Sequence, residues 1–147
     1  MTNGDYHMRK WGFFAFLGLV VAVFLFHSIY NNSQLGFNKE RVKTVQDAVI
    51  ETIKNNDKVS VSSVGEGHRP KGGGWSITIT FVSQLSESET VDLILNPLKP
   101  IIKSDIINKR STNNSTSYLL SHNNYGVYML YKDRYDGNWE IGITSNP

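Results

Sequence analysis

The sequence of 147 residues contains no cysteine. Without a thiol the chain cannot form a disulfide, a thiolate metal site or a thiol-linked lipid anchor, and it cannot use a cysteine nucleophile. Small eukaryotic secreted domains are often stapled by disulfides, so this absence weighs mildly against that class. It leaves bacterial envelope proteins open, because their domains of this size can fold without disulfides.

An excess of one charge is also missing. Asp5, Arg9 and Lys10 are the charged residues of the first ten, and the chain after residue 30 carries 13 Lys or Arg against 12 Asp or Glu. A domain so nearly neutral has no overall field that would attract nucleic acid or anionic lipid. The sequence therefore predicts no nucleic-acid partner.

Motifs that carry chemistry are absent as well. No two histidines stand at the two-, three- or four-residue spacing of metal ligands; they are His7, His27, His68 and His122. No serine lies within a G-x-S-x-G frame. We therefore expect no enzyme activity, no cofactor and no metal.

One long hydrophobic run is present, from Trp11 to Tyr30, and it contains no Asp, Glu, Lys or Arg. As a helix, such a run spans about 30 Å, which matches the hydrocarbon core of a bilayer. Trp11 and Tyr30 lie at its ends, where amphipathic rings prefer the membrane interface. The run predicts a transmembrane helix over residues 11–30, with the lipid bilayer as its partner.

A cleaved signal peptide is the main alternative to a retained anchor, since a basic tail also precedes signal sequences. Cleavage needs small residues three and one before the cut, and Ser28 has Phe26 in the earlier position. Retention is therefore favoured. The adjacent Arg9 and Lys10 favour an N-terminus in the cytoplasm and a domain outside a bacterial inner membrane.

The chain then divides into a tail (1–10), the transmembrane helix (11–30), a polar linker (31–37) and one extracytoplasmic domain (38–147). Gly36 is expected to break the chain direction, and Asn38 to cap the helix that follows. That helix, over about 39–55, is indicated by one apolar face at helical spacing: Val42, Val45, Val49 and Ile53.

Strands are expected at 59–64, 75–81, 118–121, 127–131 and 139–143, and the alternation from Trp75 to Phe81 is the strictest of them. Ser86 and Glu89 have capping-box spacing and begin a second helix, which breaks near Asn96 and ends by Arg110. Asp136-Gly137 indicates a hairpin turn. The order α-β-β-α-β-β-β predicts an α+β fold, an antiparallel sheet with helices packed on one face.

Two weak candidate sites remain. The glycine-rich segment 65–74 carries His68, Arg69 and Lys71, which could bind an anion, although a strand rather than a helix follows it and a mobile connection explains it more simply. The aromatic residues near the end of the chain could form a protein interface or pack in the core, and the candidates for an interface are Tyr128, Tyr131, Tyr135 and Trp139.

The layout of tail, span, linker and compact domain resembles that of inner-membrane assembly subunits of secretion systems. It predicts a non-catalytic domain that binds another envelope protein, or a second copy of itself, in a secretion, conjugation or pilus-assembly system. An anchored immunity or inhibitor protein against an envelope-acting toxin has the same layout.

A third alternative is a pilin-like filament subunit. Gly12-Phe13, after Arg9-Lys10, resembles the junction at which prepilins are processed. The pattern expects Glu at the fifth mature position, where this chain has Leu17, and a basic residue in place of Trp11.

Overall fold

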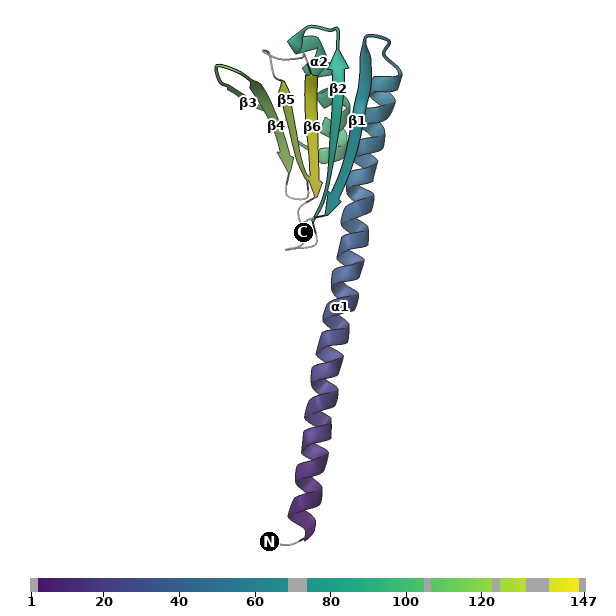
Figure 1. Cartoon of the computed structure of the whole chain (residues 1–147), viewed down its shortest axis with the longest axis vertical. Helices are drawn as coiled ribbons and strands as arrows, with labels where there is room; N and C mark the ends of the chain where they lie inside the picture. Colours follow the sequence, from purple (N-terminus) through teal and green to yellow (C-terminus); the bar gives the residue numbers. More distant parts are fainter. Residues whose placement is uncertain (1–2, 69–73, 105–106, 123–124, 132–137, 146–147) are drawn as a thin grey trace. The chain divides into compact units, whose positions relative to one another are not determined.

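The computed structural model describes residues 3–68, 74–104, 107–122, 125–131 and 138–145 (Figure 1), with side chains described in 12–67, 74–104, 108–121, 125–129 and 138–145. The chain forms two compact units, residues 1–34 and residues 35–147. The second unit contains six strands and the shorter helices, and it is one small α+β domain.

The first element, α1 (Asn3–Lys54), is a continuous helix of 52 residues. Two local expectations near the end of the predicted linker are wrong: Gly36 does not break the helix, and Asn38 lies inside it, buried, rather than at its start. A glycine in a helix interior costs only about 1 kcal/mol, and no proline stands in the segment to remove a backbone donor. The expected apolar face is confirmed, since Val42, Val45 and Val49 are almost fully buried.

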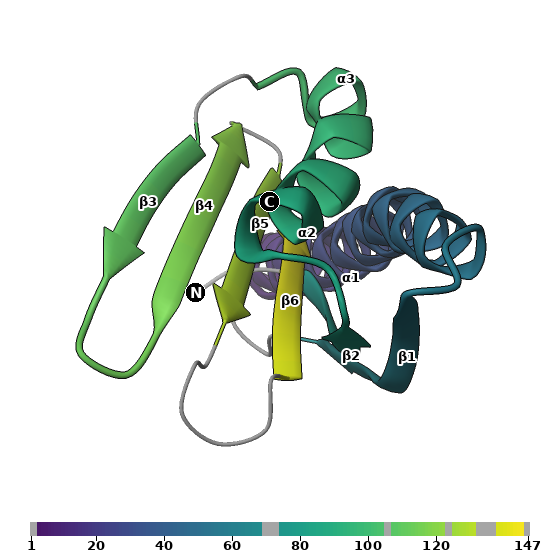
Figure 2. The same ribbon diagram turned by 90° about the horizontal axis from the view of Figure 1, so that it is seen from above.

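The sheet has six strands, all antiparallel, in the spatial order β1-β2-β6-β5-β4-β3 (Figures 1 and 2). Their bounds are β1 (Val59–His68), β2 (Trp75–Ser83), β3 (Ile107–Ser111), β4 (Thr116–His122), β5 (Tyr125–Tyr131) and β6 (Asn138–Ser145). The predicted α+β class and antiparallel sheet are confirmed. The β5–β6 hairpin forms as expected, although its Asp136-Gly137 turn lies outside the described residues.

Three short helical segments connect β2 to β3: α2 (Glu87–Leu95), the 3₁₀ turn η1 (Asn96–Leu98) and α3 (Lys99–Ile102). The capping box is confirmed, because the Ser86 hydroxyl accepts from the Glu89 amide while the Glu89 carboxylate accepts from the Ser86 amide. The predicted extension of the helix to Arg110 is wrong. It ends at Ile102, where Lys103 turns the backbone to a left-handed φ of 57°.

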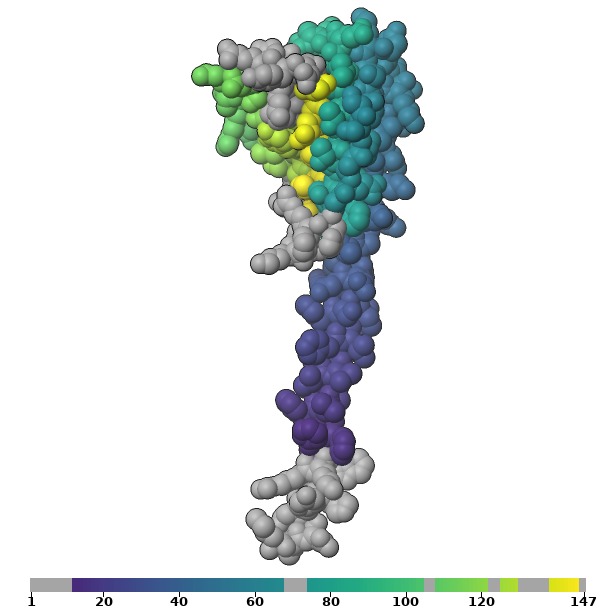
Figure 3. Space-filling view, viewed as in Figure 1, coloured from purple at the N-terminus to yellow at the C-terminus, as the bar shows by residue number. Residues whose placement is uncertain are grey.

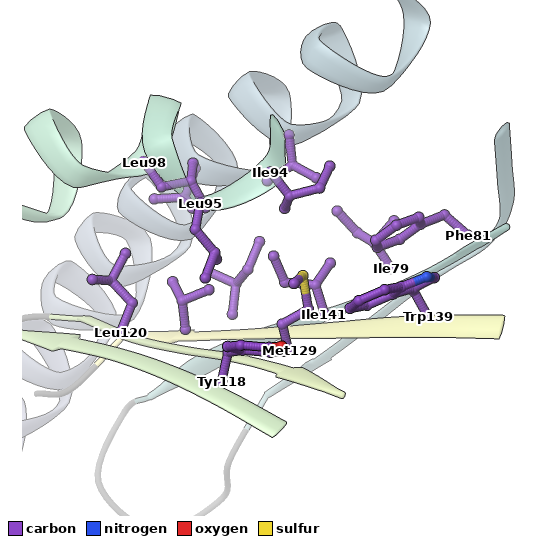
Figure 4. Packing of buried hydrophobic residues seen from close by; sticks show 14 of the residues in the cluster. Ile79, Phe81, Ile94, Leu95, Leu98, Tyr118, Leu120, Met129, Trp139 and Ile141 are labelled. Carbon is purple, nitrogen blue, oxygen red and sulfur yellow. The ribbon is translucent and has the colours of Figure 1, made fainter. Parts of the chain in front are cut away.

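All the helices that pack on the sheet lie on one face, as predicted (Figure 2). The hydrophobic core fills the space between the helices and the sheet (Figure 4). From the sheet, Ile79, Phe81 and Ile141 point toward Ile94 and Leu95 of α2 (Figure 4). Phe81 and Trp139 face each other across neighbouring strands with ring centroids 6.1 Å apart and planes 9° from parallel. This stacked pair lies in the core.

Candidate interaction surfaces

The face of the sheet opposite the helices, here called the outer face, carries mostly small hydroxyl side chains and glycine. In Figure 3 the atoms of β6 are visible between those of β2 and β5. Residues paired across antiparallel strands share a face, so the register assigns to the outer face Gly65, Thr78, Gly142, Tyr128, Leu119 and Asn108 in one row across the sheet.

The largest exposed side chains of this row are neighbours. Leu119 pairs directly with Tyr128, and the two side chains are 39% and 42% exposed. Tyr128 pairs on its other side with Gly142, which has no side chain. The flanking row contributes the charges of Glu140 and Arg110, on β6 and β3. The outer face is thus nearly neutral, with one aromatic residue near its centre.

The predicted aromatic interface is divided by the sheet. Trp139 is 2% exposed and belongs to the core, so it cannot share a docking surface with Tyr128 on the outer face. The strand register pairs Tyr131 with Trp139, and Tyr135 lies outside the described residues. Of the two predicted interface residues whose side chains the structure describes, Tyr128 lies on an exposed face and Trp139 does not; the side chain of Tyr131 lies outside the described part.

A cluster that the sequence did not indicate joins α2 to the edge of the sheet. The Tyr118 hydroxyl and the Lys109 ammonium both donate to the Glu87 carboxylate, with Lys109 Nζ 3.0 Å from Oε1. These hydrogen bonds, first from Tyr118 and then from Lys109, lower the pKa of Glu87. Burial and then the bond to Glu87 raise the pKa of Tyr118, so its hydroxyl stays protonated and a donor at neutral pH. We interpret the cluster as a structural contact that holds α2 against strands β3 and β4.

The predicted anion loop remains a prediction. Arg69 and Lys71 lie outside the described residues, and the backbone of His68 ends β1. Strand β2 begins at Trp75, so the segment joins two paired strands, as the simpler interpretation expected. Among the described residues, no group of three His, Asp or Glu side chains is arranged to hold a metal ion.

A second surface lies on the first turns of α1 that belong to the domain. The Arg41 guanidinium lies 3.8 Å from the centroid of the Phe37 ring, and the Lys39 ammonium lies 4.8 Å from the centroid of the Trp75 ring. Phe37 is 49% exposed. These four residues are here called the aromatic–basic patch.

The apolar part of α1 has the length and composition to cross a membrane, and none of that stretch is buried in the structure. The same properties fit a signal sequence near an N-terminus. Of the two residues predicted to lie at the membrane–water interface, Tyr30 is 61% exposed, and the side chain of Trp11 lies outside the described residues.

Fold and sequence together define an apolar N-terminal helix followed by a small α+β domain. No protein-family model matches the chain. No curated protein matches it either. Among solved structures, it is similar to the crystal structure of the "putative lipoprotein LppA from Mycobacterium tuberculosis", with 8% sequence identity, a TM-score of 0.49 and 79% of each chain covered. At that level the similarity carries no argument about this chain.

Proposed function

We propose that the chain is a single-pass protein of the cell envelope whose domain binds another protein through the outer face. The observation that carries the proposal is the contrast between the two faces of the sheet. One face is covered by the helices, whereas the other presents Leu119 and Tyr128 at its surface. Tyrosine is enriched at binding hot spots because it combines a large apolar area with a hydroxyl group.

The cluster of Glu87, Lys109 and Tyr118 does not have the pKa shifts of a catalytic site. It uses its hydrogen bonds internally, and it leaves Glu87 ionised and Tyr118 protonated at neutral pH. A general base or nucleophile needs a pKa shifted toward the working pH, which is the opposite of both shifts. We accordingly propose that this cluster is structural, and we propose a non-catalytic domain without a cofactor because the sequence carries no catalytic motif.

The anchor and its flanking charges support a location in the bacterial inner membrane, with the N-terminus in the cytoplasm and the domain outside. In that location we propose that the partner is an envelope protein of a secretion, conjugation or pilus-assembly system. Alternatively, the chain is an immunity protein, and its outer face binds an envelope-acting toxin. A toxin gene beside the coding sequence would favour the alternative.

Site-specific crosslinking tests the outer face. A photoreactive benzoylphenylalanine at Tyr128 should give one discrete adduct in living cells, and the same group at the exposed Thr44 of α1 should not. Adding Leu119→Glu should remove the adduct, since it places an unpaired charge beside the photoreactive side chain at position 128. Identical adducts from both positions, or an adduct that survives Leu119→Glu, would refute binding at this face.

Topology is testable because the chain has no cysteine of its own. Ser60→Cys, at an exposed position of β1, should react with a membrane-impermeant maleimide in spheroplasts before lysis. Thr2→Cys should react only after lysis. The reverse pattern would place the domain in the cytoplasm.

Intact mass of the purified membrane protein decides the pilin alternative. A full-length chain supports a retained anchor, whereas a product that begins at Phe13 would support pilin-like processing.

A further inference from the structure

The aromatic–basic patch combines two side-chain types that proteins place where membrane meets water. Aromatic rings settle at the level of the headgroups, and Lys and Arg extend their charges toward them. In this chain the two types are in contact, as the Arg41–Phe37 and Lys39–Trp75 distances show. Phe37 keeps nearly half of its surface exposed, so burial inside the domain does not explain it.

The charge of the patch is local. Although the domain as a whole is almost neutral, residues 39–43 hold Lys39, Arg41 and Lys43 against Glu40 alone. Lys39, Glu40 and Lys43 are all exposed. A cluster of this kind is attracted to an anionic surface within about a Debye length, whatever the charge of the rest of the domain.

Chain length keeps the patch near the bilayer. Phe37 follows Tyr30, the last residue of the apolar run, by seven residues. Seven residues reach about 25 Å when fully extended and about 10 Å as a helix. If the anchor is retained, an anionic surface is therefore always within reach, at a high effective concentration.

We propose that the aromatic–basic patch rests on anionic lipid headgroups and thereby fixes which end of the domain faces the membrane. This inference depends on the retained anchor of the proposed function. Trp75 begins β2 and pairs in register with His68, the last residue of β1, so the patch includes one end of the β1–β2 hairpin. With the patch on the membrane, that end of the hairpin lies at the lipid surface and the other end lies away from it.

Two reporter positions on the same strand distinguish the ends. Gly67→Cys lies beside the patch, where an added Cβ would meet Ser76 Oγ at an ordinary 3.5 Å. Ser60→Cys, the matched control, is exposed and stands seven residues away on β1, or about 20 Å. Each full-length variant carries one fluorophore and is reconstituted in phosphatidylcholine vesicles with or without phosphatidylglycerol, together with a lipid spin-labelled at its headgroup.

We expect stronger quenching at position 67 than at 60 in vesicles that contain phosphatidylglycerol, and a loss of the difference at 1 M salt, where screening is strong. Each basic residue near an anionic surface contributes about fivefold to the docking equilibrium. The double variant Lys39→Gln/Arg41→Gln should therefore lower that equilibrium about twenty-five-fold, and Lys54→Gln, at the far end of α1, should leave it unchanged. Circular dichroism of each variant checks that the domain is folded.

Flotation of the vesicles separates the two hypotheses. A chain that does not float refutes the anchor and the lipid contact together. A chain that floats and shows equal quenching at 60 and 67, or quenching indifferent to phosphatidylglycerol and to Lys39→Gln/Arg41→Gln, refutes the lipid contact alone.

Discussion

The placement of Trp139 in the core predicts a large loss of stability when the side chain is removed. The residue is 2% exposed and its ring stacks on Phe81. A buried aromatic side chain removes roughly 150–250 Å² from water, and at about 25 cal/mol/Å² this stabilises by about 4–6 kcal/mol as an upper bound. Measured aromatic-to-alanine substitutions in cores cost about 3–5 kcal/mol, so we expect that loss for Trp139→Ala. This is a large part of the 5–15 kcal/mol that is typical of a whole domain.

Tyr128→Thr is the matched control, because Tyr128 is 42% exposed on the opposite face and threonine suits a strand. It should cost less than about 1 kcal/mol. Urea titration of the full chain in detergent micelles, followed by pulse proteolysis, measures both losses without using tryptophan fluorescence. Equal shifts of the unfolding midpoint would show that the two aromatic residues are equally exposed in solution, and the core assignment of Trp139 would fail.

Three further predictions use the same titration. Glu87→Gln should destabilise the domain at neutral pH. The folded-state pKa of Glu87 lies below its ordinary value of 4.5, so the stability that the ionised carboxylate contributes is present above pH 4.5 and is lost as the pH falls through the folded pKa. The difference in unfolding free energy between wild type and variant should therefore disappear in acid. A gap that widens in acid would reverse the sign and contradict the lowered pKa. Gly126→Ala should cost about 1–2 kcal/mol, because its Cβ would come within 2.8 Å of Thr144 Oγ1, and adding Thr144→Ala should recover most of the loss; no recovery would mean that another contact is responsible. Lys103→Gly should stabilise by about 1 kcal/mol, since glycine adopts the left-handed conformation without strain, and a loss of stability would show that the lysine side chain contributes more than its backbone strain costs.

The local periodicity of apolar residues was sufficient to predict much of the secondary structure. The spacing of Val42, Val45 and Val49 predicted the buried stripe of α1, and alternation from Trp75 to Phe81 predicted β2, because both depend on near neighbours in the sequence. The capping box is another short-range device, and it formed as expected. The strand order could not follow from such signals, since β6 pairs with β2 across a separation of about sixty residues.

The errors arose where a local pattern fits two structures. Ile106 and Ile107 follow Ile101 and Ile102 at a spacing that suits a continuing helix, but the backbone takes a left-handed turn at Lys103 and Ile107 begins the edge strand β3. Helix α1 continues through Gly36 because a single glycine destabilises a helix only slightly, and the backbone hydrogen bonds of the helix outweigh that cost.

The candidate site was harder to predict than the fold. Trp139 alternates with Ile141 and Ile143, so its place in the core could have been inferred from the strand period. The contact between Glu87 and Tyr118 joins residues 31 apart in the chain and has no short-range signature.

The position of β6 has a consequence for the order of folding during synthesis. Of the six strands that the structure describes it comes last in the sequence, yet in the sheet it lies between β2 and β5. In the proposed topology, until β6 has crossed the membrane and joined the sheet, the β1–β2 hairpin and the β3–β5 meander each present an open edge where β6 will pair. Between neighbouring unfolded chains, those two edges are where mispairing would begin. A nonsense mutation just ahead of Asn138 would therefore leave two separate half-sheets rather than a slightly shortened domain.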